Sequence, residues 1–257
     1  MHAENFNLEN YCKRIGFNGK PEANLQTLQQ LMRSQLFSVA FENLDVQAGK
    51  IVSLVPEDIV NKIVNSQRGG YCYEVNGLFS MALDAVGFEH YFVAARPMFY
   101  PVRRPKTHMG VIAKIDGEEF LCDLGFGSFG IRAPLSLSVI NETIQQDDDF
   151  FRLSCDDGKN YIMQALVDGE WVNQYGFDLN AQEWIDFMPA NYLNSTHPDT
   201  IFVQKLLVVK HNPLGRKILL DNRLKTIEKG VTEFQDIPAD DINNLLEKEF
   251  GLVVSKA

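Results

Sequence analysis

The sequence predicts an α+β fold, in which helices come first and antiparallel strands follow. Residues 1–90 carry apolar side chains at helical spacing, whereas in residues 91–190 two Asp-Gly dipeptides separate apolar stretches, as in hairpins. Residues 191–257 combine short β-rich stretches with one final helix. Because 45% of the 257 residues are hydrophobic, the chain can build a sizeable core from these three parts.

Three helices are expected in the first part. Apolar residues recur at helical spacing over 25–32, and Pro56 opens a second helix with two acids in its first turn. The third helix is expected to run from Cys72 to Val86, because its apolar side chains form one stripe and Gly87 is placed to end it.

The hairpin at Asp116-Gly117 sets the register of the second part. It joins two expected strands, Thr107–Ile115 and Glu118–Leu124. A two-residue turn pairs residues whose numbers add up to 233. Asp168-Gly169 predicts a second hairpin of the same kind.

The third part is expected to hold strands and a closing helix. Ile201–Val209 is a β-rich apolar stretch, and Ile218–Leu220 and Leu224–Ile227 are expected to pair near it. The last helix follows Pro238 and stops at Gly251.

Composition excludes several classes of protein. A net charge of −10 argues against binding to nucleic acid, and no apolar run approaches the roughly 20 residues that span a membrane. The first residues lack the basic and apolar regions of a signal peptide, so a cytoplasmic protein with free thiols is expected. The four cysteines form no CxxC pair and no zinc-like spacing, so no metal is expected. Residues 141–200, with 2 basic and 12 acidic groups, are expected to form a solvated acidic face.

Cys72 is the candidate nucleophile. It begins the third helix, where the positive end of the helix dipole favours a thiolate. Gly69 and Gly70 precede it and allow a tight turn and close approach of a substrate, and Gly70 is a position where φ could be positive. A buried, inert cysteine is the alternative interpretation.

His108 and Asp123 are candidate partners of that thiol. The predicted register makes them diagonal neighbours on one face of the hairpin, with Cβ atoms roughly 7 Å apart. A histidine can take the thiol proton, and an aspartate can orient the imidazole. The alternatives are a structural histidine, a turn acid, and a metal site built from all three groups.

Three cations, Arg103, Arg104 and Lys106, lie just before His108. Beside an active site they would suit a substrate that carries phosphate. The alternative is an ordinary exposed loop.

Taken together, these motifs resemble the arylamine N-acetyltransferase family. The resemblance covers almost the whole chain and rests on the following motifs: Phe41-Glu42-Asn43-Leu44, Arg68-Gly69-Gly70-Tyr71-Cys72, Thr107-His108-Met109, Asp123-Leu124-Gly125-Phe126-Gly127 and Ser195-Thr196-His197-Pro198. It implies an N-terminal helical bundle with the nucleophile over 1–90 and an antiparallel β-barrel with the His and Asp over 91–190. A linker and α/β lid would follow over 191–257, in a fold related to papain-like cysteine proteinases.

The resemblance also implies roles for individual residues. Cys72 would accept an acetyl group from acetyl-CoA, His108 would be the base, and Asp123 would orient it. Small aromatic amines or hydrazines would be the acceptors. The remaining implied assignments are a structural ion pair of Glu42 and Arg68, an aromatic pocket of Phe41, Tyr71, Phe126 and Phe202, and a coenzyme cleft along Thr107, Phe126 and Gly127.

The sequence departs from the family pattern at Ala40, Cys122 and His197, and His197 could alter the pocket for the acceptor. Two other functions use the same residues. A cysteine hydrolase would pass the acyl group to water, and a non-catalytic binding domain would keep the fold without the chemistry.

Overall fold

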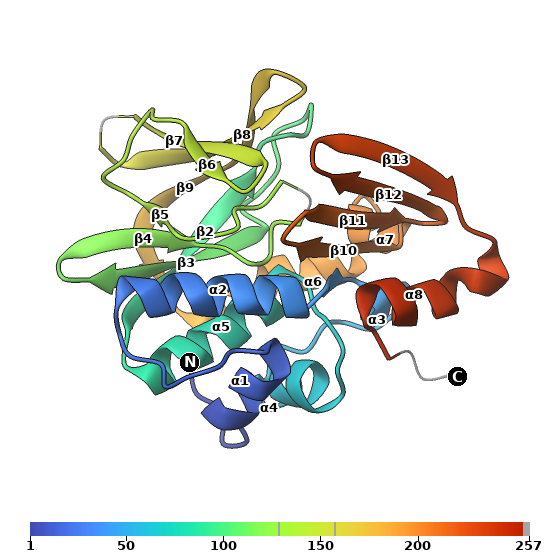
Figure 1. Cartoon of the computed structure of the whole chain (residues 1–257), viewed down its shortest axis with the longest axis horizontal. Coiled ribbons are helices and arrows are strands. Elements are labelled where there is room, and N and C mark those ends of the chain that lie inside the picture. The colour runs from blue at the N-terminus through green and yellow to red at the C-terminus, as the bar shows by residue number, and fades with distance from the viewer. Residues whose placement is uncertain (128, 157, 254–257) are drawn as a thin grey trace.

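The structure is a computed structural model that describes residues 1–127, 129–156 and 158–253. Helices form the lower half of Figure 1, a curled sheet lies above them on the left, and a second sheet lies on the right. This is the mixed α and β architecture that the sequence predicts. The last four residues of the expected third part lie outside the described residues.

Helices make up most of the first ninety residues: α1 (Leu8–Ile15), α2 (Leu25–Ser38), α3 (Leu44–Gln47), α4 (Pro56–Val60) and α5 (Cys72–Val86). Asparagine side chains at Asn7 and Asn24 accept backbone N–H bonds at the starts of α1 and α2. The predicted bounds of α5 are confirmed, and Gly87 ends it in the left-handed conformation, with φ 96°. A π-helical turn, Asn61–Asn65, follows α4.

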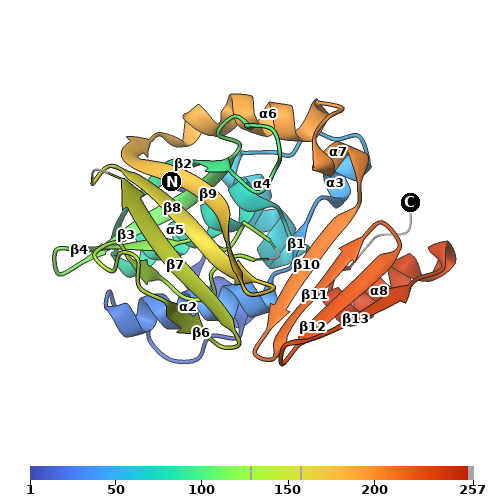
Figure 2. The ribbon, with the colours of Figure 1, turned by 90° about the horizontal axis from the view of Figure 1, so that it is seen from above.

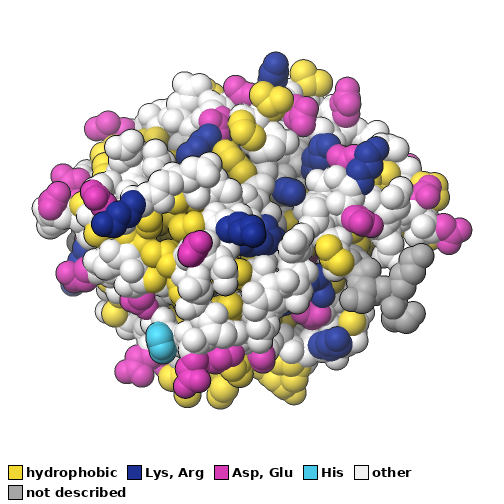
Figure 3. All heavy atoms as spheres, turned by 60° about the horizontal axis from the view of Figure 1, so that its bottom comes forward, with side chains coloured by type: hydrophobic (Ala, Val, Ile, Leu, Met, Phe, Trp, Pro, Cys, Tyr) yellow, Lys and Arg dark blue, Asp and Glu magenta, His cyan; other side chains and the backbone are white. Residues whose placement is uncertain are grey.

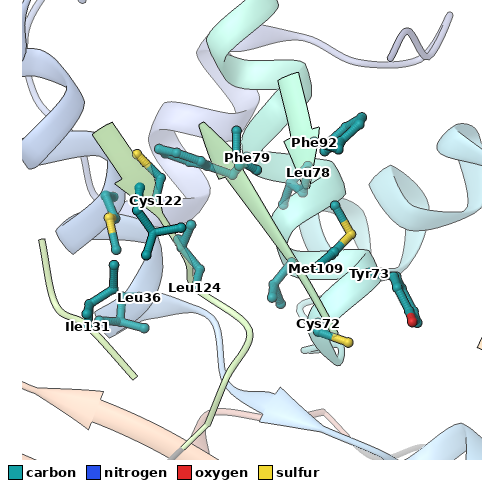
Figure 4. Packing of buried hydrophobic residues seen from close by; sticks show 14 of the residues in the cluster. Leu36, Cys72, Tyr73, Leu78, Phe79, Phe92, Met109, Cys122, Leu124 and Ile131 are labelled. Atoms are coloured by element: carbon teal, nitrogen blue, oxygen red, sulfur yellow. The ribbon is translucent and has the colours of Figure 1, made fainter. Parts of the chain in front are cut away.

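Helix α5 is the centre of the core. Every residue from Cys72 to Leu83 is buried, so the helix is enclosed on all sides. Figure 4 shows Leu78 and Phe79 of α5 packed among apolar side chains of the sheet, with Cys72 at the end of the helix. This enclosure fixes the position of the thiol relative to the strands.

Eight antiparallel strands form the first sheet, in the order β5-β4-β3-β2-β9-β8-β7-β6. Their bounds are β2 Glu89–Pro97, β3 His108–Ile115, β4 Glu118–Cys122, β5 Leu135–Ser136, β6 Ile144–Gln146, β7 Asp149–Asp156, β8 Asn160–Val167 and β9 Glu170–Gln182. The sheet curls into a half-barrel, as both Figure 1 and Figure 2 show. Both Asp-Gly dipeptides form the predicted turns, with positive φ at each aspartate and glycine.

The predicted register of β3 and β4 is confirmed. Ile115 pairs with Glu118, and the ladder continues to Val111 opposite Cys122. Strand β4 ends at Cys122, two residues earlier than expected, because the Leu124 amide turns away from the ladder to donate to the Asn76 side chain.

The second sheet has the order β1-β10-β11-β12-β13. Its strands are β1 Phe41–Glu42, β10 Leu207–Asn212, β11 Gly215–Leu220, β12 Arg223–Glu228 and β13 Val231–Asp236. The pairing of Ile218–Leu220 with Leu224–Ile227 is confirmed within β11 and β12. Strand β1 pairs with β10, so a two-residue piece of the helical part belongs to the sheet of the third part.

Helices α6 (Met188–Thr196) and α7 (Ile201–Gln204) connect the two sheets, and Figure 2 shows them spanning both. The expected strand Ile201–Val209 is therefore wrong over its first half. The Asn43 side chain donates to the carbonyls of Phe202 and Lys205, which gives this apolar stretch polar partners outside any sheet. Helix α8 (Ile242–Phe250) is the expected last helix, and Gly251 ends it with φ 67°.

Charged side chains are spread over the surface. On the face drawn in Figure 3, acidic and basic side chains are interspersed. The expected solvated acidic face is wrong in one respect. Asp147 and Asp149 pair with Arg132, which is 1% exposed, and Asp149 also pairs with the buried Arg216 of β11. Asp149, in β7, therefore connects the two sheets through Arg216.

Candidate active site

Cys72 is the first residue of α5, and it is 2% exposed. The first turn is held by Glu74, whose side chain accepts from the Tyr71 amide at 3.0 Å in a capping box. Cys72 lies on the wall of a pocket of about 380 Å³. The thiol is thus nearly closed to bulk water but open to a cavity that can hold a ligand.

The two glycines before Cys72 are needed for space. A Cβ on Gly69 would lie 2.1 Å from the Ala40 carbonyl oxygen, and a Cβ on Gly70 would lie 2.7 Å from the Glu74 Cβ. Neither glycine has a positive φ, so the expected left-handed conformation at Gly70 is wrong. Close packing of the turn against its own capping residue requires glycine there.

His108 and Asp123 meet as the hairpin arithmetic predicts. His108 Nε2 lies 2.7 Å from Asp123 Oδ2, and both side chains are buried. Because a carboxylate oxygen only accepts, Nε2 carries the hydrogen, and Nδ1 is left as the nitrogen that can take a proton. His108 lines the same pocket as Cys72.

Asn76 joins these elements, although no motif in the sequence marks it. Its amide nitrogen donates to Asp123 Oδ1 at 3.1 Å and to the Met109 carbonyl at 3.0 Å, while its oxygen accepts from the Leu124 amide. Asn76 follows Cys72 by four residues, one helical turn, and this spacing is the signal in the sequence that could have found it.

Tyr175 of β9 packs against the imidazole. Its ring centroid lies 5.0 Å from that of His108 and 4.8 Å from that of Phe126. Burial, and then the negative charge of Asp123, raises the pKa of the Tyr175 phenol. No sequence pattern marked this residue, because β9 reaches His108 only through the pairing of distant strands.

The electrostatics of Cys72 depend on its neighbours. Burial is the largest cause that raises the pKa of the Cys72 thiol, and the charge of Asp123 raises it further, whereas the Tyr73 backbone N–H lowers it. The N–H groups at the helix terminus thus lower the pKa of the thiol, as expected, but they do not outweigh burial and the charge of Asp123. A thiolate needs a cation beside it, and a protonated His108 can supply that charge.

A cluster of charges supports the other side of the turn. Arg68 donates to Glu42 Oε1 at 2.8 Å, which brings the expected ion pair together. Lys62, from the π-helical turn, contacts Glu74 at 2.7 Å and Asp45 at 2.6 Å. Burial raises the pKa of Glu74 to about 7.

The pocket walls are mainly apolar and include several aromatic rings. Phe41, Phe126 and Phe202 line the pocket as expected, and so do Thr107 and Gly127. Tyr71 does not line it. Its ring packs edge-on against Phe202 at 5.6 Å, and its hydroxyl bonds to Asn191 of α6, so it supports the wall from behind.

Two glycines in the segment after Asp123 are held closely. A Cβ on Gly125 would lie 2.5 Å from the Cys72 Cα, so glycine lets this segment pack against the start of α5. The Gly127 carbonyl accepts from His211 Nε2 of β10 at 3.0 Å. Burial and two neighbouring arginines lower the pKa of His211 to about 3, so this contact stays neutral at ordinary pH.

The three cations before His108 do not form one cluster. Arg104 lines the pocket, whereas Arg103 is exposed and Lys106 pairs with Asp178 at 2.6 Å. The expected three-charge phosphate site is therefore reduced to a single guanidinium at the pocket.

Comparison with known proteins places the chain in a family. A family model described as N-acetyltransferase matches residues 24–257. The arylamine N-acetyltransferase / N-hydroxyarylamine O-acetyltransferase of Salmonella typhimurium is 30% identical over 95% of this chain and 86% of its own length. The chain belongs to the arylamine N-acetyltransferase family. It is thus an enzyme of the acyltransferase class.

Solved structures of the arylamine N-acetyltransferase family share the whole fold. The Salmonella typhimurium enzyme superposes with a TM-score of 0.92 at 28% identity, over 97% of this chain and 92% of that chain. The Mycobacterium marinum enzyme, whose structure is in complex with CoA, superposes with a TM-score of 0.90 at 30% identity, over 96% and 93%.

None of the three departures from the arylamine N-acetyltransferase pattern lines the pocket. Ala40 packs in the core of the second sheet, Cys122 is buried in β4, and His197 is exposed after α6 and does not line the pocket. Within residues 1–127, 129–156 and 158–253, no group of three or more His, Cys, Asp or Glu side chains could hold a metal ion. No helix in that part of the chain combines the length and the apolar character needed to cross a bilayer.

Proposed function

We propose that this enzyme moves the acetyl group of acetyl-CoA to the amine of an arylamine, arylhydrazine or hydrazide through an acetyl-Cys72 intermediate. The observation that carries the proposal is a single pocket lined by Cys72 and by His108, which is hydrogen-bonded to Asp123. Membership in the arylamine N-acetyltransferase family supports the reaction, and the CoA complex of the Mycobacterium marinum enzyme supports the donor.

The first half-reaction makes the thioester on the protein. His108 Nδ1 takes the proton of Cys72, and the thiolate attacks the acetyl carbonyl carbon. The bond between that carbon and the coenzyme sulfur breaks, and the coenzyme leaves as a thiol with the proton that His108 returns. Cys72 then carries the acetyl group.

The second half-reaction uses the same base. The amine nitrogen attacks the acetyl carbonyl carbon while His108 takes a proton from that nitrogen. The bond from carbon to Cys72 Sγ breaks, and the proton returns to the sulfur. The product is an N-acetylated amine, and the enzyme is restored, so the two substrates react in turn in a ping-pong sequence.

Asp123 and Asn76 act as positioning residues. Asp123 holds the hydrogen on His108 Nε2, which keeps Nδ1 available, and its charge stabilises the imidazolium. Asn76 holds the other carboxylate oxygen and links it to α5, so that helix and hairpin stay in register. The aromatic walls at Phe41, Phe126 and Phe202 suit a flat ring, and Thr107 and Gly127 suit the coenzyme arm.

The test is incubation with acetyl-CoA alone, followed by mass spectrometry. We expect one acetyl group on Cys72, which a later addition of arylamine removes as the acetylated amine. Good turnover without any adduct after rapid quenching would contradict the covalent route. Cleavage of arylamides without donor, at a rate above that of acetyl transfer, would identify a cysteine hydrolase instead.

A further inference from the structure

The active-site pocket is nearly without charge. In the part of the chain that the structure describes, its lining holds no carboxylate, and Arg104 is its only charged residue apart from the titratable His108. Arg104 lies in the segment between β2 and β3, next to Phe99 and Tyr100 of the same wall. A cation on an aromatic wall attracts anions more strongly than one in open water, because fewer water molecules screen it.

Contacts hold Arg104 in place without neutralising it. Its guanidinium carbon lies 4.6 Å from the centre of the Tyr100 ring, and Nη2 donates to the Asp199 carbonyl at 3.0 Å. Within the described residues no carboxylate forms an ion pair with it, in contrast to the pair of Lys106 with Asp178 at 2.6 Å. Arg104 is half-buried, and its guanidinium is oriented and electrostatically unbalanced.

We propose that Arg104 binds a carboxylate on the ring of the acceptor, so that the enzyme prefers anionic arylamines to neutral ones. This inference rests on the proposed function. The planar guanidinium matches a carboxylate, and the aromatic lining matches the ring that carries it. One cation balances one carboxylate. A coenzyme A molecule carries several phosphate charges, and Arg103 and Lys106 do not line the pocket to help with them.

The test compares 4-aminobenzoic acid with its methyl ester, which has the same ring and amine but no charge. The measured quantity is the ratio of kcat/KM for the acid to kcat/KM for the ester. We expect Arg104→Gln to lower this ratio about tenfold, the size of effect typical of a hydrogen bond to a charged group. Arg103→Gln is the matched control, because this neighbour is exposed and lies outside the pocket. Arg104→Lys keeps the charge and should lower the acid-to-ester ratio less than Arg104→Gln does.

A second measurement separates acceptor from coenzyme. The acetylation of Cys72 is followed in a single turnover at several acetyl-CoA concentrations. One outcome is that Arg104→Gln raises the acetyl-CoA concentration needed for half-maximal acetylation of Cys72 but leaves the acid-to-ester ratio unchanged. Arg104 then binds a coenzyme phosphate, and the proposal is overturned. An unchanged ratio with unchanged acetylation overturns it as well.

A binding measurement keeps the inference separate from the proposed function. If the wild-type enzyme forms no acetyl-Cys72, the proposed function fails, but calorimetric titration with the acid and the ester still tests Arg104. About tenfold weaker binding of the acid alone to Arg104→Gln upholds the carboxylate site. Equal binding of the acid to both proteins overturns it.

Discussion

Two groups of buried or partly buried polar side chains lie on different sides of the first turns of α5. One group is His108, Asp123 and Asn76, which are joined by hydrogen bonds and include a pocket-lining imidazole. The other, the Lys62–Glu74 cluster, consists of Glu42, Asp45, Lys62, Arg68 and Glu74. Since Glu74 follows Cys72 by two residues, it lies about 200° around the helix from the thiol.

The two groups differ in whether a side chain keeps an atom that can still take a proton. Lys62 contacts three carboxylates, and Arg68 contacts two of the same three, so every charged side chain of that cluster has a partner of opposite sign. His108 uses one ring nitrogen on Asp123 and keeps the other for a proton. Burial of charge therefore does not mark a reactive site by itself. A reactive site is marked by a titratable group that can still take a proton and that lines a cavity.

The largest expected effect follows removal of the thiol. Cys72→Ala should abolish the acetyl adduct and lower turnover by at least about a thousandfold, because among the described residues that line the pocket no other group is a comparable nucleophile. The control is Cys155→Ala, which removes a half-buried thiol of β7 outside the pocket lining. This variant should keep both the acetyl adduct on Cys72 and the turnover of the wild type. Persistence of an acetyl adduct on Cys72→Ala would contradict the assignment.

Asp123→Asn should lower kcat by about 10²- to 10⁴-fold, because the imidazolium loses its partner and the tautomer is no longer set. The informative measurement is the rate of Cys72 alkylation by iodoacetamide as a function of pH, with folding checked by circular dichroism. If Asp123 acts through His108, the variant needs a higher pH for fast alkylation. The direct charge effect has the opposite sign, since Asp123 raises the pKa of the Cys72 thiol. Faster alkylation at low pH would therefore show that His108 is not the link.

Gly70→Ala tests the support of the turn by the Lys62–Glu74 cluster. The new Cβ would meet the Glu74 Cβ at 2.7 Å and its Oε2 at 2.9 Å, so the capping contact to the Tyr71 amide must move. We expect a loss of about 1–3 kcal/mol in the free energy of unfolding, as for other overpacked sites. Activity should fall further than this loss explains, and Gly70→Val should lose more. A folded, fully active Gly70→Val enzyme would exclude the role of this turn.

The variant with the smallest expected effect on activity tests the pH dependence of stability. Because the pKa of Glu74 is raised to about 7, the folded state binds this proton more tightly than the unfolded state. The stabilisation of the folded state by this proton is complete below the ordinary glutamate pKa and is lost as the pH rises through 7. Glu74→Gln should remove this decline, which for one proton amounts to at most about 1.4 kcal/mol per pH unit.

Urea denaturation at pH 5, 6.5 and 8 measures this decline, with the exposed Glu142→Gln as the control. The pH profile of Cys72 alkylation should stay close to that of the wild type, in contrast to Asp123→Asn. A strongly shifted alkylation profile in Glu74→Gln would mean that the two groups of polar side chains are not separate in function.

Features that depend on a few consecutive residues could be predicted from the sequence. The bounds of α5 follow from its apolar stripe and from Gly87, and the register of β3 and β4 follows from the Asp116-Gly117 turn. The approach of His108 to Asp123 follows in turn from that register. Local geometry is enough here, because each step involves residues within one helix or one hairpin.

The proposed catalytic residues Cys72, His108 and Asp123 and the α+β fold could thus be predicted from the sequence itself, since helical periodicity and a two-residue turn leave little freedom. Only the tertiary structure decided what surrounds them. Asn76 and Tyr175 meet Asp123 and His108 because α5 and β9 pack there. Arg104 lines the pocket while its charged neighbours do not, and burial outweighs the N–H groups of the first helical turn in the pKa of Cys72. These outcomes depend on desolvation and on contacts between distant segments, which no local pattern encodes.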